Sequence, residues 1–521
     1  MNAKPSHFTS RLLLAAALVL AGGALQETAA QERYHRTLGE NMWNQGRNVN
    51  GLRLNPSTGN ASYAELYGHA RKGGFHASNE SSSPFGFGVT AKTVTWSRKV
   101  SMAGSFSFSQ EKGTDMDGSM FIHPGRYPVD VLEFTPGTKI LQRYSFTGGM
   151  AADLTEHWKA GASISYESAN YAKRKDIRHT NYALDIEVVP SIMYTSGAFC
   201  AGLSLPVRKT AESIQAEQIG STADTYYAFL DKGLMYGILQ SWDGSGVHLK
   251  ETGVDRFPVS EYSLGAAAQL GWRKFYADIE FDLTRGVVGE KDYNWFKFPG
   301  KRISATAGVT IEGSAARHLV SLSCSWMLRQ DYEYVMERVT TGGVTVPVTY
   351  GSNRVFEQRR LEAGPRYGMF SDKVVIEAQA GAVREKKLST LRYPAVGEED
   401  ITLLQAAAKA TFKAGRWRLG LLTSFSACPS GRDAILDSTT GTSTSEAPAG
   451  LFRLQEWYDL DHEWKTATRA GCGISITRYL GLKGLDGIYI GAGGGFLKGF
   501  GTVHAAGDKL FSATARIGYE F

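Results

Sequence analysis

The sequence has few cysteines, few prolines and no long apolar run beyond its N-terminus. Its 521 residues include 4 Cys and 15 Pro. The cysteines are far apart and show neither a CxxC pair nor a histidine spacing typical of zinc sites. They are Cys200, Cys324, Cys428 and Cys472. Most lie within strand-like patterns, where Cys behaves as a small apolar residue, so we expect unpaired, structural thiols.

Concentrated charge is also missing. The formal net charge of +6 is spread along the chain without a basic block, so we expect no nucleic-acid partner. No Ser/His/Asp or paired-carboxylate arrangement can be placed, so we expect neither an enzyme nor a bound cofactor. The acidic cluster around His462, from Asp459 to Glu463, could ligate a metal, but we expect it at the outer rim of the fold.

The N-terminus carries an export pattern. Lys4 and Arg11 precede the apolar run Leu12–Leu25, and small residues stand just before Gln31. A basic start, a short apolar core and a small-residue cleavage site are typical of a secretory signal peptide. The run is shorter than the roughly 20 residues of a spanning helix. We therefore predict that residues 1–30 are removed and that the mature chain begins at Gln31.

Glycine and aromatic residues are abundant, with 59 Gly, 24 Tyr and 25 Phe, and many segments alternate strictly between apolar and polar residues. In the last eleven residues, FSATARIGYEF, one series is apolar and the other is small or charged. Successive strand side chains point to opposite faces, so this pattern predicts strands with one apolar face. The same unit recurs as paired segments around tight turns, for example on both sides of Thr155–His157.

Counting alternating segments predicts 18 strands, with 16 possible because three of the segments are weak. The segments are 61–75, 85–97, 100–110, 140–154, 158–171, 181–194, 199–206, 259–270, 275–286, 301–312, 318–330, 353–369, 374–387, 401–413, 417–427, 464–476, 487–498 and 508–521. Most are longer than globular strands, which usually run about 5 or 6 residues.

Short and long connections alternate between these strands, which is the layout of an outer-membrane barrel. The long connections include 111–139, 207–258, 340–352 and 429–450. We therefore predict an all-β, antiparallel, up-and-down transmembrane barrel with short periplasmic turns and long extracellular loops. Backbone groups in lipid all need partners, so the last strand should pair with the first. Residues 31–60 are predicted to form a periplasmic extension or a short plug, and 61–521 the barrel.

Several stretches resemble an outer-membrane β-barrel family of Bacteroidota that has only a domain-of-unknown-function label. They are SYAELYGHARKGGF, SFSFSQEKGTDMDGSMFIHP, YPVDVLEF and ESANYAKRKDIRHTNYALDIEV. The resemblance runs from about Arg33 to Phe521. It implies a barrel in the cell outer membrane and brings neither a substrate nor active-site residues.

Three groups of residues are candidates for function. Charges expected to face the lumen could create a transverse field, or could simply be solvated or paired; they are Asp278, Glu280, Asp282, Arg359, Arg366, Arg516 and Glu520. Loop aromatics could contact a polar ligand, or could form a constriction or pack on each other; they are Tyr226, Tyr227, Tyr236 and Trp242. The last apolar positions resemble a signal for the barrel-assembly machinery; they are Ile517, Tyr519 and Phe521.

Two functions fit this reading. We expect an integral outer-membrane barrel that is a channel or transporter for a small solute. The alternative is a non-conducting scaffold or accessory barrel in a larger outer-membrane complex. The expected partners are outer-membrane lipid, the barrel-assembly machinery, and either a small solute or other envelope proteins.

Overall fold

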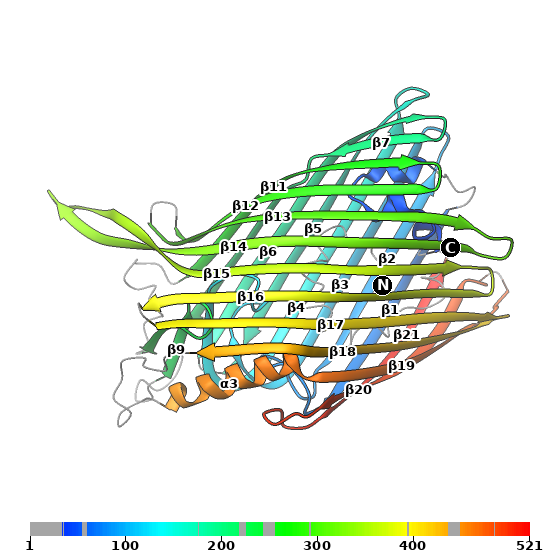
Figure 1. Cartoon of the computed structure of the whole chain (residues 1–521). Helices are drawn as coiled ribbons and strands as arrows, with labels where there is room; N and C mark the ends of the chain where they lie inside the picture. The colour runs from blue at the N-terminus through cyan, green and yellow to red at the C-terminus, as the bar shows by residue number, and fades with distance from the viewer. Residues whose placement is uncertain are drawn as a thin grey trace.

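In a computed structural model the chain forms one closed antiparallel β-barrel (Figure 1). The structure describes residues 34, 36–54, 60–175, 177–217, 226–242, 256–290, 293–392, 395–435, 449–483 and 485–521. The predicted signal peptide therefore lies outside the described residues.

The described strands are long and tilted, as Figure 1 shows. Their bounds are β1 Ala61–Gly73, β2 Phe85–Trp96, β3 Val100–Ser119, β4 Asp130–Asp153, β5 Trp158–Lys173, β6 Arg178–Ser196, β7 Phe199–Ser204, β8 Val207–Glu217, β9 Tyr226–Asp231, β10 Gly237–Trp242, β11 Phe257–Trp272, β12 Phe275–Glu290, β13 Tyr293–Glu312, β14 Arg317–Thr341, β15 Val344–Phe370, β16 Val374–Arg392, β17 Ala395–Ala414, β18 Trp417–Ile435, β19 Thr468–Tyr479, β20 Ile488–Phe500 and β21 Lys509–Glu520.

The barrel closes through β1 and β21, which pair antiparallel with Leu66 opposite Ile517. Strands β7 and β8 both pair with β6 and β11, so together they occupy one position in the ring. Strands β9 and β10 form a hairpin that pairs with β4 and is not one of the strands that make up the closed ring. The described residues thus form an 18-strand barrel, which confirms the predicted architecture and strand number.

Alternation decides which face of each strand meets the outside. Ile279 is 56% exposed and Leu322 58% exposed, whereas Glu280 is only 1% exposed. The apolar series therefore faces outward, and the polar series faces the lumen. An outward apolar band around a polar interior is the arrangement of a transmembrane β-barrel, because lipid meets the outer face and water the inner one.

Helices are few among the described residues. Two short 3-10 helices, η2 (Met42–Gln45) and η3 (Val49–Arg53), lie near the N-terminus, and α3 (Ala449–Thr466) connects β18 to β19. In the described part of the chain, no helix combines the length and the apolar character needed to cross a membrane.

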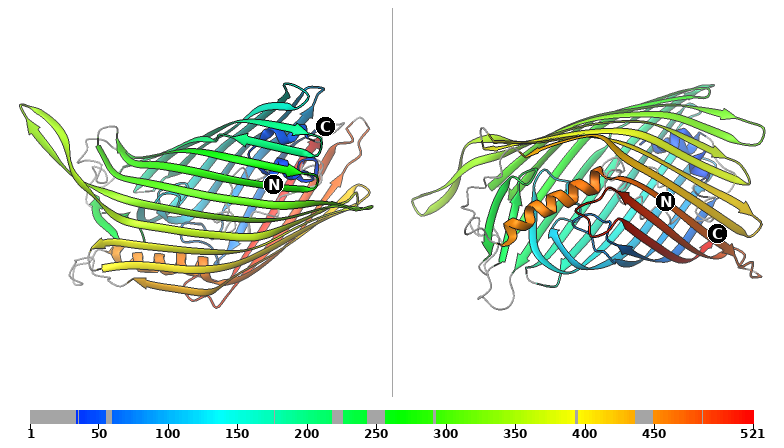
Figure 2. Two further views of the ribbon diagram at one scale, coloured as in Figure 1. Left: turned by 45° about the horizontal axis from the view of Figure 1, so that its top comes forward. Right: turned by 60° about the horizontal axis from the view of Figure 1, so that its bottom comes forward.

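The two ends of the barrel differ. Figures 1 and 2 place η2 and η3, in blue, at the same end as the C-terminus and the short turns. Helix α3, in orange, lies at the opposite end, where the β14–β15 hairpin extends far beyond the other strands. We call these the short-turn end and the long-loop end.

Several predicted loops at the long-loop end are partly regular structure. Residues 111–119 and 130–139 extend β3 and β4, and 207–217 form β8, so the connection predicted over 111–139 shrinks to 120–129. Strand β19 begins at Thr468 rather than at 464, because α3 occupies the preceding residues. The four cysteines are free thiols.

Candidate functional site

The N-terminal segment, residues 34–54, lies inside the short-turn end of the barrel and follows its inner wall. Its first described residue, Tyr34, packs edge-on against Tyr63 of β1, with ring centroids 5.9 Å apart. Further along, Trp43 packs edge-on against Tyr276 of β12 at 5.3 Å. Finally the indole N–H of Trp96 in β2 donates to the Leu52 carbonyl at 3.0 Å. The segment thus returns almost to the strand beside which it began.

Arg47 anchors the middle of this segment. Its guanidinium donates to Glu187 of β6 at 2.9 Å and is ion-paired with Glu280 and Asp282 of β12, the latter at 3.8 Å. The Arg47 side chain is 5% exposed. A buried cation of this kind is tolerated only where carboxylates pair with it. Glu187, Glu280 and Asp282 therefore determine where the segment sits.

A second arginine anchors the end of the segment. Arg53 forms an ion pair with Asp153 of β4 and donates to the Ser97 carbonyl at 3.0 Å and to the Ser101 hydroxyl at 3.1 Å. Between the two arginines, the Asn48 amide donates to the Ile192 carbonyl at 3.1 Å. These polar contacts stand beside apolar ones, because Met42, Trp43 and Leu52 are buried against the inner wall.

Inward-facing glycines make room for the segment. A Cβ at Gly308 of β13 would stand 2.0 Å from the Met42 methyl, and one at Gly271 of β11 would stand 2.7 Å from the Trp43 ring. The same holds for glycines on other strands: Gly149 and Gly161 beneath Val49, and Gly202 beneath Asn48. Because five strands contribute such positions, the wall is shaped to the segment along much of its path.

A small cavity of about 20 Å³ lies beside Arg47, roughly enough for one water molecule. Its lining carries both signs of charge: Arg47, Glu187, Pro206, Arg208, Ser263, Asp282, Thr284 and Arg302. Arg208 donates to Asp185 at 2.6 and 2.9 Å, so part of this positive charge is already paired. The site is a dense ion-pair network.

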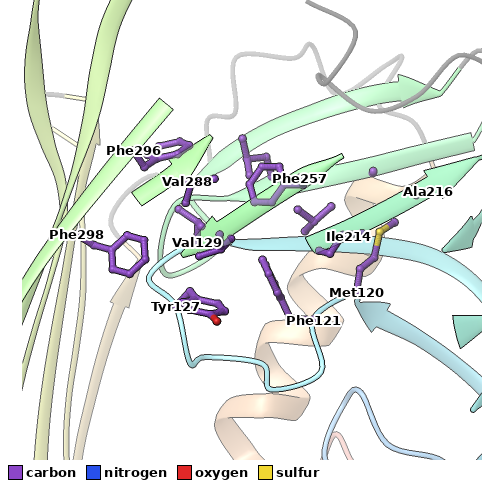
Figure 3. Close-up of a cluster of buried hydrophobic side chains, with 14 of the residues drawn as sticks. Met120, Phe121, Tyr127, Val129, Ile214, Ala216, Phe257, Val288, Phe296 and Phe298 are labelled. Carbon is purple, nitrogen blue, oxygen red and sulfur yellow. The ribbon is translucent and has the colours of Figure 1, made fainter. Parts of the chain in front are cut away.

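A cluster of buried apolar side chains lies at the long-loop end, as shown in Figure 3. The loop 120–129 contributes Met120, Phe121, Tyr127 and Val129, which meet side chains of β8, β11, β12 and β13. Figure 3 shows Phe121 near Phe257 and Tyr127 near Phe298; the respective ring centroids are 6.2 and 6.0 Å apart. The loop therefore folds inward, toward the lumen.

Polar contacts hold this loop across the barrel. Arg126 is ion-paired with Asp185 of β6, and its carbonyl accepts a hydrogen bond from Arg329 of β14. Arg329 in turn donates to Glu261 of β11 at 2.9 Å. Since β6 and β14 are separated around the ring, the loop spans part of the lumen.

The β9–β10 hairpin and α3 also pack at the long-loop end. Lys232 in the turn of the hairpin pairs with Glu333 of β14 at 2.5 Å. Trp457 of α3 packs with Phe134 of β4. Glu463 of α3 accepts backbone N–H groups of residues 503–505, two of them at 2.8 and 2.9 Å. Although burial alone raises the pKa of Glu463, these donors hold it below its ordinary value.

The structure places most of the predicted lumen charges on the inner wall. Glu280 and Asp282 meet Arg47, and Asp278 accepts hydrogen bonds from Gln269 at 2.8 Å and Tyr276 at 3.1 Å. On the opposite part of the ring, Arg516 is 6% exposed. Near it, Glu520 accepts a hydrogen bond from Tyr479 at 2.8 Å.

Arg366 and Arg359 lie on opposite faces of β15. Arg366 is half-buried in the inward series of β15. Arg359 lies two residues from Leu361 and therefore on the same, outward face of β15; its side chain is 62% exposed and pairs with Glu357 at 2.7 Å. Its placement differs from the sequence prediction because 359 and 366 have opposite parity along an unbroken register.

The predicted loop aromatics lie in packing contacts. Tyr226 contacts the cluster of Figure 3, Tyr227 the cluster around Phe134, and Tyr236 the cluster of Phe356 and Tyr458. The side chain of Trp242 lies outside the described residues. At the C-terminus, Ile517 and Phe521 are 50% and 62% exposed, and the rings of Tyr519 and Phe521 stack at 5.6 Å.

The cluster from Asp459 to Glu463 lies on α3, whose turns direct its members apart. Asp461 pairs with Lys465 at 2.6 Å, and His462 meets Glu399 of β17 at 3.4 Å. Among the described residues no three such groups are placed to hold a metal ion.

Sequence reasoning missed Arg47, Arg53 and the wall glycines. A signal was present, because glycine recurs at inward positions of β4, β5, β7, β11 and β13 near their short-turn ends. Glycine weakens a strand unless another group approaches closely there. Such a pattern indicates that a second segment lies against the inner wall.

Residues 51–521 match the profile of a family of unknown function, DUF6850. No curated protein matches the sequence.

Among solved structures, the chain is similar at very low identity to proteins that include a receptor and a transporter. For the ferric preacinetobactin receptor BauA of Acinetobacter baumannii, the identity is 7% and the TM-score 0.37, over 88% of this chain and 80% of that one. For the iron transporter FrpB of Neisseria meningitidis the values are 8% and 0.40, over 90% and 82%. For OccAB3 of A. baumannii they are 8% and 0.33, over 89% and 100%. Neither the identities nor the TM-scores support a transfer of function.

Proposed function

The chain belongs to the family of unknown function DUF6850, and we propose that it is an outer-membrane channel or transporter for a small solute. In this proposal the short-turn end faces the periplasm, and residues 34–54 act as a plug that closes it. The observation that carries the proposal is the contrast between the two faces of the strands. Ile279 and Glu280 are neighbours in β12, yet one is 56% and the other 1% exposed.

A polar lumen supports passage of a solute. A barrel that served only as a lipid-embedded scaffold could fill its interior with apolar side chains. Here the inner wall carries carboxylates and guanidinium groups on β6, β12, β15 and β21, among them Asp185, Glu280, Arg366 and Arg516. Polar interiors of barrels this wide are typical of aqueous paths, which loops or plugs can obstruct.

The N-terminal segment has the properties of a displaceable plug. Its principal anchors, Arg47 and Arg53, are ion pairs and hydrogen bonds that water can replace. The ring itself is closed by the β1–β21 ladder, which contains no residue of the segment. We therefore expect the barrel to persist when the segment leaves.

The test is single-channel conductance of the purified, refolded protein in a planar bilayer. Four proteins are compared: the intact chain, a chain lacking residues 34–54, a chain in which residues 218–256 and the loop 120–129 are each replaced by a short turn, and the combination. We expect the combination to conduct steadily, and the intact chain to be closed or to conduct least. A matched control removes residues 340–345 from the tip of the β14–β15 hairpin, which projects away from the barrel (Figure 1).

A folded but silent combined variant would contradict transport and favour the second candidate, a non-conducting scaffold. One observation favours that candidate: the β14–β15 hairpin extends beyond the barrel, with Val335 and Tyr350 46% and 63% exposed. A scaffold should co-purify with other envelope proteins, and deletion of the hairpin tip should release them.

A further inference from the structure

We propose that the wall formed by β6 and β12 gives the lumen a preference for the cationic group of a solute. Glu187, Glu280 and Asp282 supply this preference, and Arg47 masks it while the N-terminal segment is in place. The inference rests on the proposed function and deepens it, since it names the charge class that the opened lumen favours.

Two strands that are distant in sequence bring the carboxylates together. Glu187 belongs to the inward series of β6, and Glu280 and Asp282 to that of β12. Their exposed fractions are 3%, 1% and 7%. Arg47 is not part of the wall, so its guanidinium is the structure's own example of a cationic group held at this position.

The charges around the site leave an excess of negative charge once Arg47 departs. The same two strands also carry Asp185 and Asp278 on their inward faces. Opposing them on the wall are Arg208, which is paired with Asp185, and Arg302, which stands opposite Asp282 in the β12–β13 register. Arg126 of the loop 120–129 also pairs with Asp185, so five carboxylates face three guanidinium groups once Arg47 has left.

Other parts of the lumen have a different balance. Near the short-turn end of β21, the inward cations Arg516 and Lys92 of β2 are matched by the inward carboxylates Glu65 of β1 and Glu520 of β21. Ser512 of β21 stands opposite Arg71 of β1. The preference is therefore a property of the β6–β12 wall and should not appear at β21.

Two half-buried serines offer matched reporter positions. Ser263 of β11 lines the cavity beside Arg47, and Ser512 faces the lumen from β21. Each is replaced by cysteine, as Ser263→Cys or Ser512→Cys, in a chain whose four native cysteines are changed to serine. The full-length chain and the chain lacking residues 34–54 are then treated with thiol reagents of equal size that carry either a trimethylammonium or a sulfonate group.

In the chain lacking residues 34–54, we expect the cysteine at 263 to react about tenfold faster or more with the cationic reagent, relative to the cysteine at 512. Walls of one sign of charge concentrate oppositely charged solutes by about this factor. The preference should weaken as salt is raised. It should disappear when Glu187→Gln, Glu280→Gln and Asp282→Asn are combined.

A second, full-length variant covers the case in which the deletion does not fold. Arg47→Met keeps the whole chain and removes the masking charge, so the rate ratio at position 263 should shift toward the cationic reagent. Folding of each variant is checked by its heat-modifiable migration in a detergent gel.

The outcomes separate the two proposals. Equal rates for both reagents at position 263, or a preference that survives the triple substitution, would overturn the charge preference alone. If the cysteine at 263 stays unreactive toward both reagents in the folded deletion, removal of residues 34–54 does not open this wall to solutes. That result would contradict the plug and the preference together.

Discussion

A buried guanidinium is stable only where its charge is paired, and Arg47 meets this condition through three carboxylates. Arg47→Met keeps an unbranched apolar stem but removes the guanidinium, which leaves Glu187, Glu280 and Asp282 without this partner. Removing one member of a buried ion pair costs about 3–5 kcal/mol. We expect the substitution to weaken the docking of residues 34–54 on the wall and to leave the pairing of the barrel strands unchanged.

Chymotrypsin provides the measurement, because Trp43 lies in the segment and its cleavage needs the segment to leave the wall. Cleavage there should be much faster in Arg47→Met. The control is Arg36→Met. Arg36 is 28% exposed and pairs with Glu40 on the same segment and with Asp372, which is 94% exposed, so these pairs are expected to contribute little to docking on the wall. Equal protection of Trp43 in both variants would show that Arg47 does not anchor the segment.

Gly118 tests a single contact at the long-loop end. It has φ +86°, and a Cβ there would lie 1.3 Å from the Trp457 ring of α3. We expect Gly118→Ala to displace α3, measured as faster hydrogen exchange in residues 449–466. Gly125 is a matched control, since it has φ +73° but nothing within 4 Å of its Cβ position. If both substitutions raise exchange equally, backbone strain and not the Trp457 contact is responsible.

At the scale of elements, the strands were predictable wherever one face meets lipid. Ile279 and Glu280 differ so strongly in environment that the period of two is visible in the sequence. Beyond the lipid this contrast ends, so residues 111–119 continue β3 without an alternating pattern. Helix α3 was also not predicted, because its apolar residues contact several elements, Trp457 at β4 and Trp464 at Phe75.

The candidate site was predictable only in part, because alternation marks the strands but not the segment that docks on them. The inward charges of β12 follow from alternation within one strand. Their partner Arg47 comes from a segment whose sequence shows no apolar periodicity, and no local pattern determines which strands the segment crosses. The placement of Arg359 and Arg366 on opposite faces of β15 could have been predicted from the sequence, because they lie an odd number of positions apart along the strand.

The β9–β10 hairpin should dock more firmly at acidic pH. Asp231 stands opposite Asp130 in the β4–β9 register. Burial raises the pKa of Asp231 to about 6, and burial together with Asp231 raises the pKa of Asp130 well above its ordinary value. The docked hairpin therefore binds more protons than the free one between about pH 4 and pH 6, and docking weakens as pH rises through this window.

Hydrogen exchange of residues 226–242, corrected for the intrinsic rate at each pH, measures this effect. Protection should be higher at pH 4.5 than at pH 7.5, by up to about 3 kcal/mol for a shift of this size. Asp231→Asn should remove much of the difference, because its amide is neutral at both values. A pH difference of unchanged size in that variant would show that other groups control the docking.

At the scale of the whole molecule, the barrel depends on closing its first strand against its last. The β1–β21 ladder runs from the Tyr63–Glu520 pair to the Gly73–Leu510 pair, and the backbone N–H of Phe521 donates to the Ser62 carbonyl at 3.0 Å. Because an unpaired edge in lipid would leave several backbone groups without partners, the last strand must be in place before the barrel is complete.

Phe521 can stabilise the barrel in two ways that an experiment can separate. If it acts only through its apolar surface in lipid, any outward phenylalanine of β21 should serve equally, and Phe511 is 54% exposed on the same face. If the assembly machinery reads the C-terminal residue, position matters. We expect Phe521→Ala to lower the amount of heat-modifiable barrel in outer membranes several-fold and Phe511→Ala to change it little. Backbone pairing is retained in both variants, so equal losses would show that apolar surface alone explains the terminal aromatic residue.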